Sequence, residues 1–259
     1  MRANRKAEWA YGGGAVDRNA PLVMLIHGAG MDHTVWRYQT RYLAHHGRRV
    51  LALDLPGHGH TPGPALKSVE QMAIWTAGRL GDEAQPASIV GHSLGGLIAL
   101  ELAATEPELV TSLTLFGCAA PMAVTGALEK AASEQRPQAV AMIIGWSYAR
   151  PSRLGGHPEP GFWQTGVSAR LLERGLTELG TDLAACREYS GGATAAAAIS
   201  QPTLAIAGKR DRMVPPDAAA ALARAIPGAR FEVVEAGHMM MLEVPEAIRR
   251  LLVDFVPSA

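Results

Sequence analysis

Six short apolar runs, each followed within a few residues by a glycine, constrain the fold of this chain more than any other feature. They are Leu22–Ile26, Arg49–Asp54, Ala87–Val90, Ser112–Phe116, Thr203–Ala207 and Phe231–Val234. Runs this short and this apolar are typical of strands that are buried on both faces of a parallel sheet. Amphipathic segments of helical period, such as 36–45 and 69–80, lie between them. This alternation predicts an α/β fold with a doubly wound, mostly parallel sheet.

Residues 119–199 interrupt the alternation, because no buried strand is evident there. Helical patterns at 124–133, 139–146 and 169–180 accompany a stretch rich in proline and glycine. We expect a helical cap over the carboxyl edge of the sheet, where open α/β sheets bind ligands. The core domain would then comprise residues 1–118 and 200–259. Four aromatic residues of this segment are expected to pack in the core of the cap itself: Trp146, Tyr148, Phe162 and Trp163.

Charge and hydropathy limit the classes of partner. Lys plus Arg and Asp plus Glu are 24 each, so the formal net charge is zero, which argues against a nucleic-acid partner. No run reaches the roughly 18 apolar residues of a membrane span, and the basic start lacks the apolar segment of a signal peptide. Cys118 and Cys186 are expected to be buried free thiols, with a disulfide as the alternative. We therefore expect a cytoplasmic protein whose partner is a small molecule.

The stretch Gly91-His92-Ser93-Leu94-Gly95-Gly96 directly follows the third apolar run and precedes a helical pattern over 97–104. Glycines two residues to either side of Ser93 permit the strained torsions and the close packing of a sharp strand-to-helix turn. Such a turn pushes the serine hydroxyl out of the sheet, within reach of a base and a substrate. The alternative is a serine that only caps the helix.

Two more loops follow strands at the same edge of the sheet. Asp211 comes after the run 203–207, and His238 comes after the run 231–234. A nucleophilic serine needs a base, and the base needs an orienting carboxylate. The alternative for Asp211 is a turn or capping role. Four other aspartates compete for the acid role, but none of them both lies in a loop after a strand and has the right chain order: Asp54, Asp82, Asp182 and Asp217. Glu243 and Glu246 are expected at the surface or at a helix start.

Five motifs together resemble the α/β-hydrolase fold superfamily over nearly the whole chain, in its serine esterase- and lipase-like form with a helical cap. They are His27-Gly28-Ala29-Gly30, Asp54-Leu55-Pro56-Gly57-His58-Gly59, Gly91-His92-Ser93-Leu94-Gly95-Gly96, Gly208-Lys209-Arg210-Asp211 and Gly237-His238. The resemblance implies a cap inserted after the sixth strand. It implies Ser93 as nucleophile, His238 as general base and then acid, and Asp211 as the group that orients the imidazole. The backbone N–H groups of Ala29 and Leu94 would form the oxyanion hole.

No metal or organic cofactor is expected. His58-x-His60 beside Asp54 has ligand-type spacing, but the further ligands of a binuclear hydrolase site do not follow. Gly12-Gly13-Gly14 and Gly28-x-Gly30 lack the remaining elements of a nucleotide-binding loop. The adaptable side chains of Met239-Met240-Met241 either line an apolar pocket or fill the space behind the histidine loop.

The identity of the nucleophile separates reaction classes within this fold. Similar proteins that open epoxides or displace halide carry aspartate at the turn, whereas Ser93 favours acyl transfer to water. We expect hydrolysis of carboxylic esters of a small, largely apolar substrate through an acyl-serine intermediate. A lactonase or a carbon–carbon bond hydrolase with the same triad is the alternative, although many of the latter carry Trp where this chain has Met239. The alternative of a different class is a non-catalytic binder of small ligands. The sequence alone does not give the substrate, the pocket-lining residues of the cap or the oligomeric state.

Overall fold

The computed structural model describes residues 9–11, 19–83, 85–153 and 163–258. One seven-stranded sheet runs in the order β1-β3-β2-β4-β5-β6-β7. Its strands are β1 (Trp9–Tyr11), β2 (Leu22–Ile26), β3 (Arg49–Leu53), β4 (Ala87–His92), β5 (Val110–Phe116), β6 (Thr203–Gly208) and β7 (Arg230–Val234). Every neighbouring pair from β3 to β7 is parallel, and β1 pairs antiparallel with β3 at the edge. The six predicted strands and the mostly parallel sheet are confirmed.

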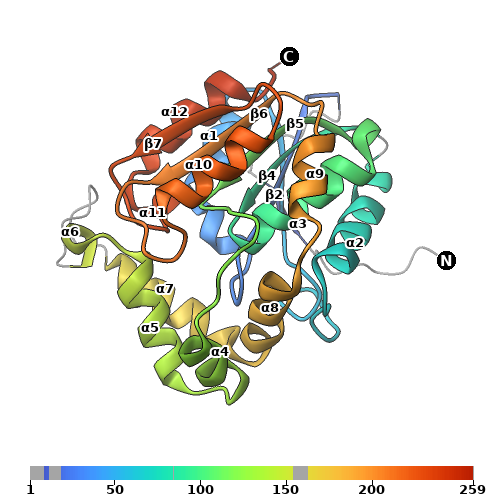
Figure 1. The fold of residues 1–259 in the computed structure, drawn as a ribbon. Helices are drawn as coiled ribbons and strands as arrows, with labels where there is room; N and C mark the ends of the chain where they lie inside the picture. The colour runs from blue at the N-terminus through green and yellow to red at the C-terminus, as the bar shows by residue number, and fades with distance from the viewer. Residues whose placement is uncertain (1–8, 12–18, 84, 154–162, 259) are drawn as a thin grey trace.

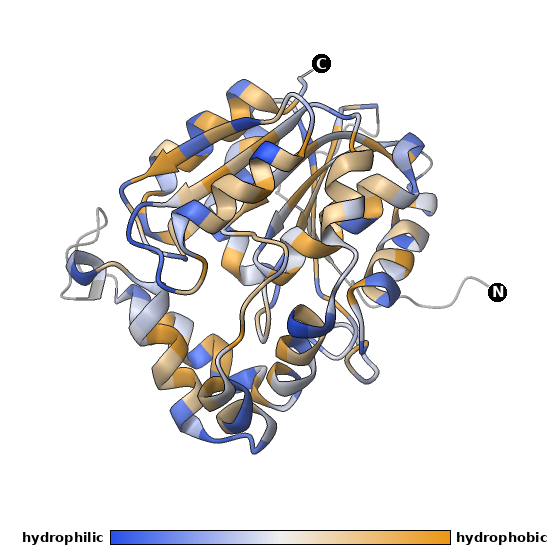
Figure 2. Cartoon of the chain, viewed as in Figure 1, coloured by the Kyte–Doolittle hydropathy of each residue, from blue (hydrophilic) through white to orange (hydrophobic). Residues whose placement is uncertain are grey.

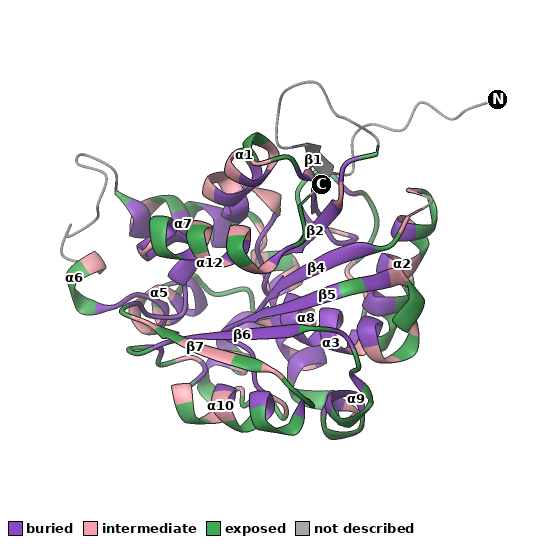
Figure 3. Ribbon diagram, turned by 90° about the horizontal axis from the view of Figure 1, so that it is seen from above, coloured by how far each residue is buried: buried purple, intermediate pink, exposed green. Residues whose placement is uncertain are grey.

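Helices cover both faces of this sheet (Figure 1, Figure 3). On one face lie α1 (Arg37–His45) and α12 (Pro245–Phe255), which pack against each other. On the other lie α2 (Val69–Gly81), α3 (Leu94–Thr105), α9 (Gly192–Ala198) and α10 (Pro216–Ala225). Three short helices join these layers: η1 (His33–Trp36), η2 (Pro107–Leu109) and α11 (Met240–Glu243).

Side chains alternate between the two faces along each central strand, as a two-residue period requires. In β2, Leu22, Met24 and Ile26 join the hydrophobic cluster under α2 and α3. Val23 and Leu25 join the cluster under α1 and α12. Because both faces of the strand are apolar, its sequence is a continuous apolar run and does not alternate between apolar and polar residues. Figure 2 shows the resulting concentration of hydrophobic residues along the sheet.

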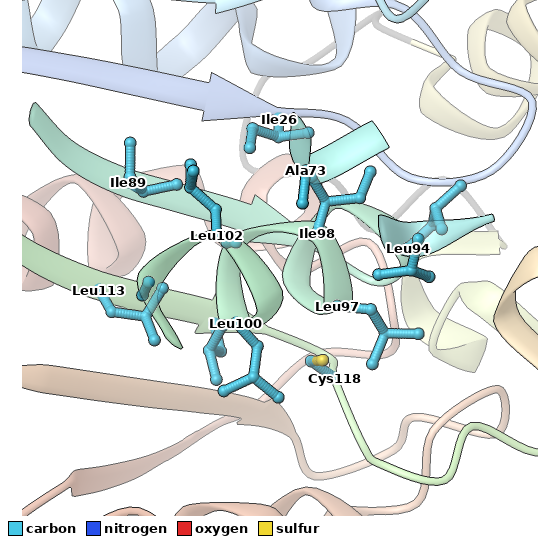
Figure 4. Close-up of a cluster of buried hydrophobic side chains, with 14 of the residues drawn as sticks. Ile26, Ala73, Ile89, Leu94, Leu97, Ile98, Leu100, Leu102, Leu113 and Cys118 are labelled. Atoms are coloured by element: carbon cyan, nitrogen blue, oxygen red, sulfur yellow. The ribbon is translucent and has the colours of Figure 1, made fainter. Parts of the chain in front are cut away.

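Helix α3 is buried on almost every side and anchors the centre of the fold. Figure 4 shows Leu97, Ile98 and Leu102 directed into the surrounding cluster from different sides of this helix. All three side chains are fully inaccessible to solvent. Truncating one such leucine typically costs about 2–5 kcal/mol, so the helix that follows Ser93 is held rigidly.

The segment between β5 and β6 is helical in its described residues. Its first five helices are α4 (Gly126–Ser133), α5 (Pro137–Ser147), α6 (Arg150–Arg153), α7 (Gln164–Arg174) and α8 (Leu176–Glu188), and of these α4, α5, α7 and α8 lie together beside one end of the sheet (Figure 1). We call the described part of 119–199 the helical insertion. It follows the fifth described strand, whereas a position after the sixth strand was expected. Within the described residues, the antiparallel edge strand β1 is the one strand that precedes β2.

Two smaller sequence expectations can be compared with the structure. The helix expected over 169–180 is divided at Gly175, a residue type that commonly ends helices. Gly175 packs directly against the backbone of Gly30, where a Cβ atom would lie 2.3 Å from the carbonyl oxygen. Cys118 and Cys186 are both buried free thiols, as expected. Within the described residues, no helix combines the length and the apolar character needed to cross a bilayer.

Candidate active site

Ser93 lies on a sharp turn between β4 and α3, with the backbone at φ 55° and ψ −116°. A positive φ is costly for a residue with a side chain, so the turn persists only because its surroundings impose it. A Cβ atom on Gly91 would lie 2.1 Å from the carbonyl oxygen of Gly95, and one on Gly95 would lie 2.3 Å from that of Ile26. Only glycine fits at these two positions. The N–H group of Ser93 donates to the carbonyl of Phe116 at 2.9 Å, which ties the turn to β5.

Asp211 and His238 meet at the carboxyl ends of β6 and β7. Nδ1 of His238 donates to Oδ2 of Asp211 at 2.7 Å, and both side chains are buried. Oδ1 of Asp211 accepts the N–H groups of Met213 and Val214, each at 2.8 Å. The aspartate therefore holds its own turn and the imidazole at once. A neutral imidazole with its hydrogen on Nδ1 has a free lone pair on Nε2, which a base needs.

Ser93 and His238 line the same pocket. The serine hydroxyl points toward the Met122 sulfur at 4.0 Å, and no hydrogen bond to His238 is present among the described residues. Catalytic hydrogen bonds are often long or misaligned until a substrate is bound, and one χ1 rotation redirects a serine hydroxyl. The structure thus brings the predicted serine and histidine to one pocket without joining them directly.

The two predicted oxyanion donors have free N–H groups. Within the described part of the chain, neither Ala29 nor Leu94 donates its backbone N–H to a protein acceptor. Leu94 is the first residue of α3, where N–H groups have no partner inside the helix and the helix dipole favours an anion. Ala29 lies at the pocket wall, in the loop after β2. We call residues 28–30 the oxyanion loop.

A buried histidine holds the start of the oxyanion loop. Nε2 of His27 accepts the N–H of Leu55 at 3.1 Å, and Nδ1 donates to the carbonyl of Gly28 at 2.9 Å. One nitrogen accepts and the other donates, so the ring is neutral. Burial, reinforced by the nearby His58, lowers the pKa of His27 to about 4, in agreement with that assignment.

The pocket has an empty volume of about 680 Å³, including the open solvent at its mouth, within the usual range for small-molecule sites. The core supplies its reactive end, with Ala29, Ser93 and His238. The helical insertion supplies most of the apolar wall through Met122, Val124, Leu128, Ile143, Trp146 and Leu183. The buried hydroxyl of Ser147, also in the wall, has no hydrogen-bond partner among the described residues. The cavity is therefore mainly apolar, with isolated polar groups.

The competing carboxylates have other partners. Asp54 is buried against His33, Asp182 lies in α8 against His58, Asp82 follows α2, and Asp217 lies in the first turn of α10. Glu246 is exposed, as expected. Of the two positions expected for Glu243, the helix start is confirmed by its place in the first turn of α11, and the surface is not, because this residue is 4% exposed and accepts the N–H groups of Ala149 and Gly237. Burial raises the pKa of Glu243 against the effect of these bonds.

Some of the aromatic and methionine side chains singled out in the sequence pack in the protein interior, and others line the pocket or lie at the surface. Tyr148 is buried within the helical insertion, as expected, whereas Trp146 lines the pocket and Trp163 is 73% exposed, which the expectation missed. Phe162 and Gly12-Gly13-Gly14 lie outside the described residues. Met239, Met240 and Met241 are buried, and none of them lines the pocket, so the space-filling alternative is favoured.

One cluster has the composition of a metal site. Ligand atoms of His33, Asp54 and His60 all lie within 4.8 Å of one another. Both oxygens of Asp54 already accept hydrogen bonds, from the N–H and Nδ1 of His33 and from the N–H of His60. These bonds join the loop after β2 to the loop after β3. The cluster therefore has a structural role. The imidazole of His46 packs beside the rings of His45 and Tyr42, and its Nδ1 lies 2.8 Å from the Tyr42 carbonyl.

Three residues that support the site were missed by the sequence interpretation. Gly117 follows β5 at φ +51°, and a Cβ atom there would lie 2.9 Å from Nδ1 of His238. The carbonyl of Ser147 accepts the N–H of His238 at 2.6 Å. Asp182 accepts the N–H of Gly30 at 2.8 Å. A glycine directly after a strand is a usable signal for the first, but the others act across distances in sequence that no local pattern spans.

Curated relatives resemble the chain over nearly its whole length. The pimeloyl-[acyl-carrier protein] methyl ester esterase of Aromatoleum aromaticum is 31% identical over 92% of this chain and 99% of the relative. The enzyme of the same name from Methylococcus capsulatus is 33% identical over 92% of this chain and 96% of its own length. Their names agree with the expectation of a hydrolase that acts on ester bonds.

The fold comparison points the same way. The enol-lactonase from Burkholderia xenovorans LB400 superposes with a TM-score of 0.82 at 25% identity, over 92% of this chain and 91% of that one. Residues 23–251 match the Alpha/beta hydrolase family. The chain belongs to the alpha/beta hydrolase family.

Proposed function

We propose that the protein hydrolyses carboxylic esters of a small, largely apolar substrate through an acyl-serine intermediate. One observation carries the proposal. The Asp211–His238 pair, bonded at 2.7 Å, and the strained Ser93 lie at the same pocket as the unpaired N–H of Ala29. This is the arrangement that acyl transfer requires: a base, a nucleophile and a donor for the developing oxyanion.

The reaction would begin with a rotation of the Ser93 hydroxyl from Met122 toward Nε2 of His238. The imidazole takes the proton while Oγ attacks the carbonyl carbon, and Asp211 stabilises the imidazolium. The oxyanion accepts hydrogen bonds from Ala29 and Leu94. Collapse of the tetrahedral intermediate releases the alcohol, which takes its proton from His238. Water then attacks the acyl-serine with His238 as base, and the carboxylic acid leaves.

We also propose that residues 119–199 act as a cap, with residues 1–118 and 200–259 as the core domain. The apolar pocket wall supplied by the helical insertion supports this division. Such a wall favours an apolar acyl chain or alcohol, and Ser147 offers it one hydroxyl. The names of the relatives add the methyl ester of a longer acyl group as a candidate substrate.

A lactone is the second candidate substrate, because the enol-lactonase shares the fold over most of both chains. An internal ester would react by the same steps, and the alcohol would remain attached to the product. A non-catalytic binder of small ligands would need the pocket but not the mechanism. These possibilities separate in one assay, because a binder turns over neither substrate.

The test is turnover of p-nitrophenyl esters of graded acyl length, a matched methyl ester series and simple lactones. We expect ester hydrolysis with a sharp optimum in chain length, because the cavity is bounded. Ser93→Ala should lower kcat by about 10³-fold or more while leaving the circular dichroism spectrum unchanged. Unchanged turnover in Ser93→Ala would overturn the proposal, and faster cleavage of lactones would change the substrate class.

A further inference from the structure

A buried carboxylate from the helical insertion contacts the oxyanion loop. Asp182 lies in α8 and is completely inaccessible to solvent. Its Oδ2 accepts the N–H of Gly30 at 2.8 Å and lies 2.9 Å from Nε2 of His58. Gly30 directly follows Ala29, the proposed oxyanion donor, and His58 lies in the loop after β3. One oxygen atom therefore joins the insertion to two loops of the core.

The hydrogen-bond partners of His58 determine its charge. Nδ1 lies 3.1 Å from the carbonyl of Pro56, and Nε2 lies 2.9 Å from Asp182. Both partners are acceptors only, so both ring nitrogens must carry hydrogen and the ring is an imidazolium. Burial lowers the pKa of His58. The hydrogen bond and the charge of Asp182, with smaller contributions from the Pro56 carbonyl and Glu178, together outweigh this effect, so the pKa of His58 is raised. The contact is therefore a buried ion pair.

The backbone around Gly30 is shaped to receive α8. Gly30 has φ +65°, and a Cβ atom there would lie 3.0 Å from the Leu179 side chain. From the other side, a Cβ atom on Gly175 would lie 2.3 Å from the carbonyl oxygen of Gly30. The start of α8 thus packs on the oxyanion loop, and Asp182 supplies the polar contact within that packing. A charge-assisted hydrogen bond is shorter and stronger than a neutral one.

We propose that Asp182 is a positioning residue for the oxyanion hole: with its charge balanced by His58, it holds the N–H of Gly30 and thereby fixes the direction of the Ala29 N–H. The inference rests on the proposed esterase function. It assigns to the helical insertion a part in catalysis as well as in substrate binding. The peptide plane between Ala29 and Gly30 is restrained by this bond, and the neighbouring Ala29 N–H follows its orientation.

The partners of Asp182 make the arrangement sensitive to substitution. Oδ1 of Asp182 has no hydrogen-bond partner among the described residues, so Gly30 and His58 together account for the stabilisation of the buried charge. A buried charge that loses its partner is strongly destabilising. Asparagine is the informative replacement, because its carbonyl oxygen can occupy the place of Oδ2 and keep both hydrogen bonds without the charge.

The test compares Asp182→Ala, Asp182→Asn and a control, Glu178→Gln, in full-length protein. Glu178 lies one helical turn before Asp182 and acts on the same histidine, but it makes no hydrogen bond to the oxyanion loop among the described residues. Ester kinetics are expressed per active site titrated by a fluorophosphonate. We expect Asp182→Ala to lower kcat by about 10–100-fold with KM unchanged, since losing an oxyanion donor outright costs about 10²–10³-fold.

Further readouts separate positioning from a general loss of structure. Asp182→Asn should recover kcat to within a few-fold of wild type, and Glu178→Gln should match wild type. The affinity of an alkyl boronic acid, which forms a tetrahedral serine adduct, should fall in parallel with kcat in Asp182→Ala. If kcat per titrated site and boronic acid affinity both stay at the wild-type level, Asp182 is only structural and the inference fails. Equal turnover by wild type and Ser93→Ala would instead overturn the proposed function itself.

If Asp182→Ala does not fold, the asparagine variant and His58→Gln carry the test. His58→Gln removes the positive charge that balances Asp182, although the amide can still donate a hydrogen bond to the carboxylate. We expect a lower kcat per titrated site than in wild type, at unchanged KM. A wild-type kcat in His58→Gln would contradict the role of the ion pair.

Discussion

The turn that carries Ser93 and the loops that carry Ala29 and His238 are held by different physical means. The turn depends on shape, because its glycines lie against backbone atoms where any Cβ would overlap. The loops depend on buried carboxylates that accept backbone or imidazole hydrogens: Asp182 for the oxyanion loop, and Asp211 and Glu243 for the histidine loop. The Ser93 turn is thus held by close backbone packing, whereas the two loops combine such packing with hydrogen bonds to buried carboxylates.

This difference has a consequence for substitutions. The turn should tolerate changes in charge but no added volume. The loops should respond to replacements that remove or reverse one of these hydrogen bonds, even where the volume of the side chain is kept. The following predictions test each side of the comparison.

The largest effect is expected where shape decides. Gly91→Ala places a methyl group 2.1 Å from the carbonyl oxygen of Gly95, so the backbone must move, and we expect a loss above about 3 kcal/mol in the free energy of unfolding. Gly78→Ala is the control, since this position in α2 has no atom within 4 Å of a Cβ and should gain about 0.5–1 kcal/mol. Urea denaturation measures both. A fully stable Gly91→Ala protein would show that the turn is not held by backbone contact.

The second effect concerns chemistry at constant volume. In Asp211→Asn, Oδ1 can still accept the N–H groups of Met213 and Val214, but the amide presents hydrogens to Nδ1 of His238. The imidazole must then carry its hydrogen on Nε2 and cannot act as base, so we expect kcat to fall by about 10³–10⁴-fold.

Steady-state ester kinetics test this second prediction, with Asp217→Asn as control. Asp217 is exposed in the first turn of α10, and its variant should retain wild-type kcat. If Asp211→Asn keeps more than about a tenth of wild-type kcat, orientation by charge is not the function of this carboxylate.

The smallest effect concerns the pH dependence of stability at the His33–Asp54 pair. The hydrogen bond to Asp54 raises the pKa of His33 above 6.5, with burial opposing it. Burial raises the pKa of Asp54, but the hydrogen bonds from His33 and His60 outweigh it and lower that pKa below 3.8. The stabilisation is therefore fully present between the two ordinary pKa values, 3.8 for Asp54 and 6.5 for His33. It is lost as the pH rises through the raised pKa of His33.

We expect His33→Gln to lose up to about 1 kcal/mol relative to wild type near pH 5.5 and less near pH 9, since partial solvent exposure weakens the pair. His45→Gln is the control, because His45 is exposed and has no carboxylate partner among the described residues. Thermal unfolding at the two pH values measures the difference. A destabilisation that is equal at both would exclude the ion pair as its source.

The sequence predicted the fold, and it predicted that Ser93, Asp211 and His238 lie at one edge of the sheet, because both inferences depend on local features of the chain. Continuous apolar runs are a local property, and so is a serine between two glycines after such a run. Asp211 and His238 were found because both follow strands whose carboxyl ends meet at one edge of the sheet. Each of these inferences needs only residues close in sequence and a rule of sheet topology.

The missed residues depend on contacts between distant parts of the chain. Asp182 bonds Gly30 from 152 positions away, and Glu243 bonds Ala149 from 94 positions away. Neither residue lies in a pattern that distinguishes it from a surface carboxylate of an amphipathic helix. The packing of Gly175 on the backbone of Gly30, at the break between α7 and α8, is likewise a contact between distant parts of the chain.

The measurement that tests the central claim most directly is labelling by a fluorophosphonate, followed by intact mass and peptide mass spectrometry. We expect one adduct per chain, located on Ser93, in wild type. In Asp211→Asn, whose imidazole cannot accept the serine proton, we expect a strongly slowed reaction. Absence of labelling at Ser93, or equal labelling in Asp211→Asn, would show that Ser93 is not an activated nucleophile and would favour a protein that only binds its ligand.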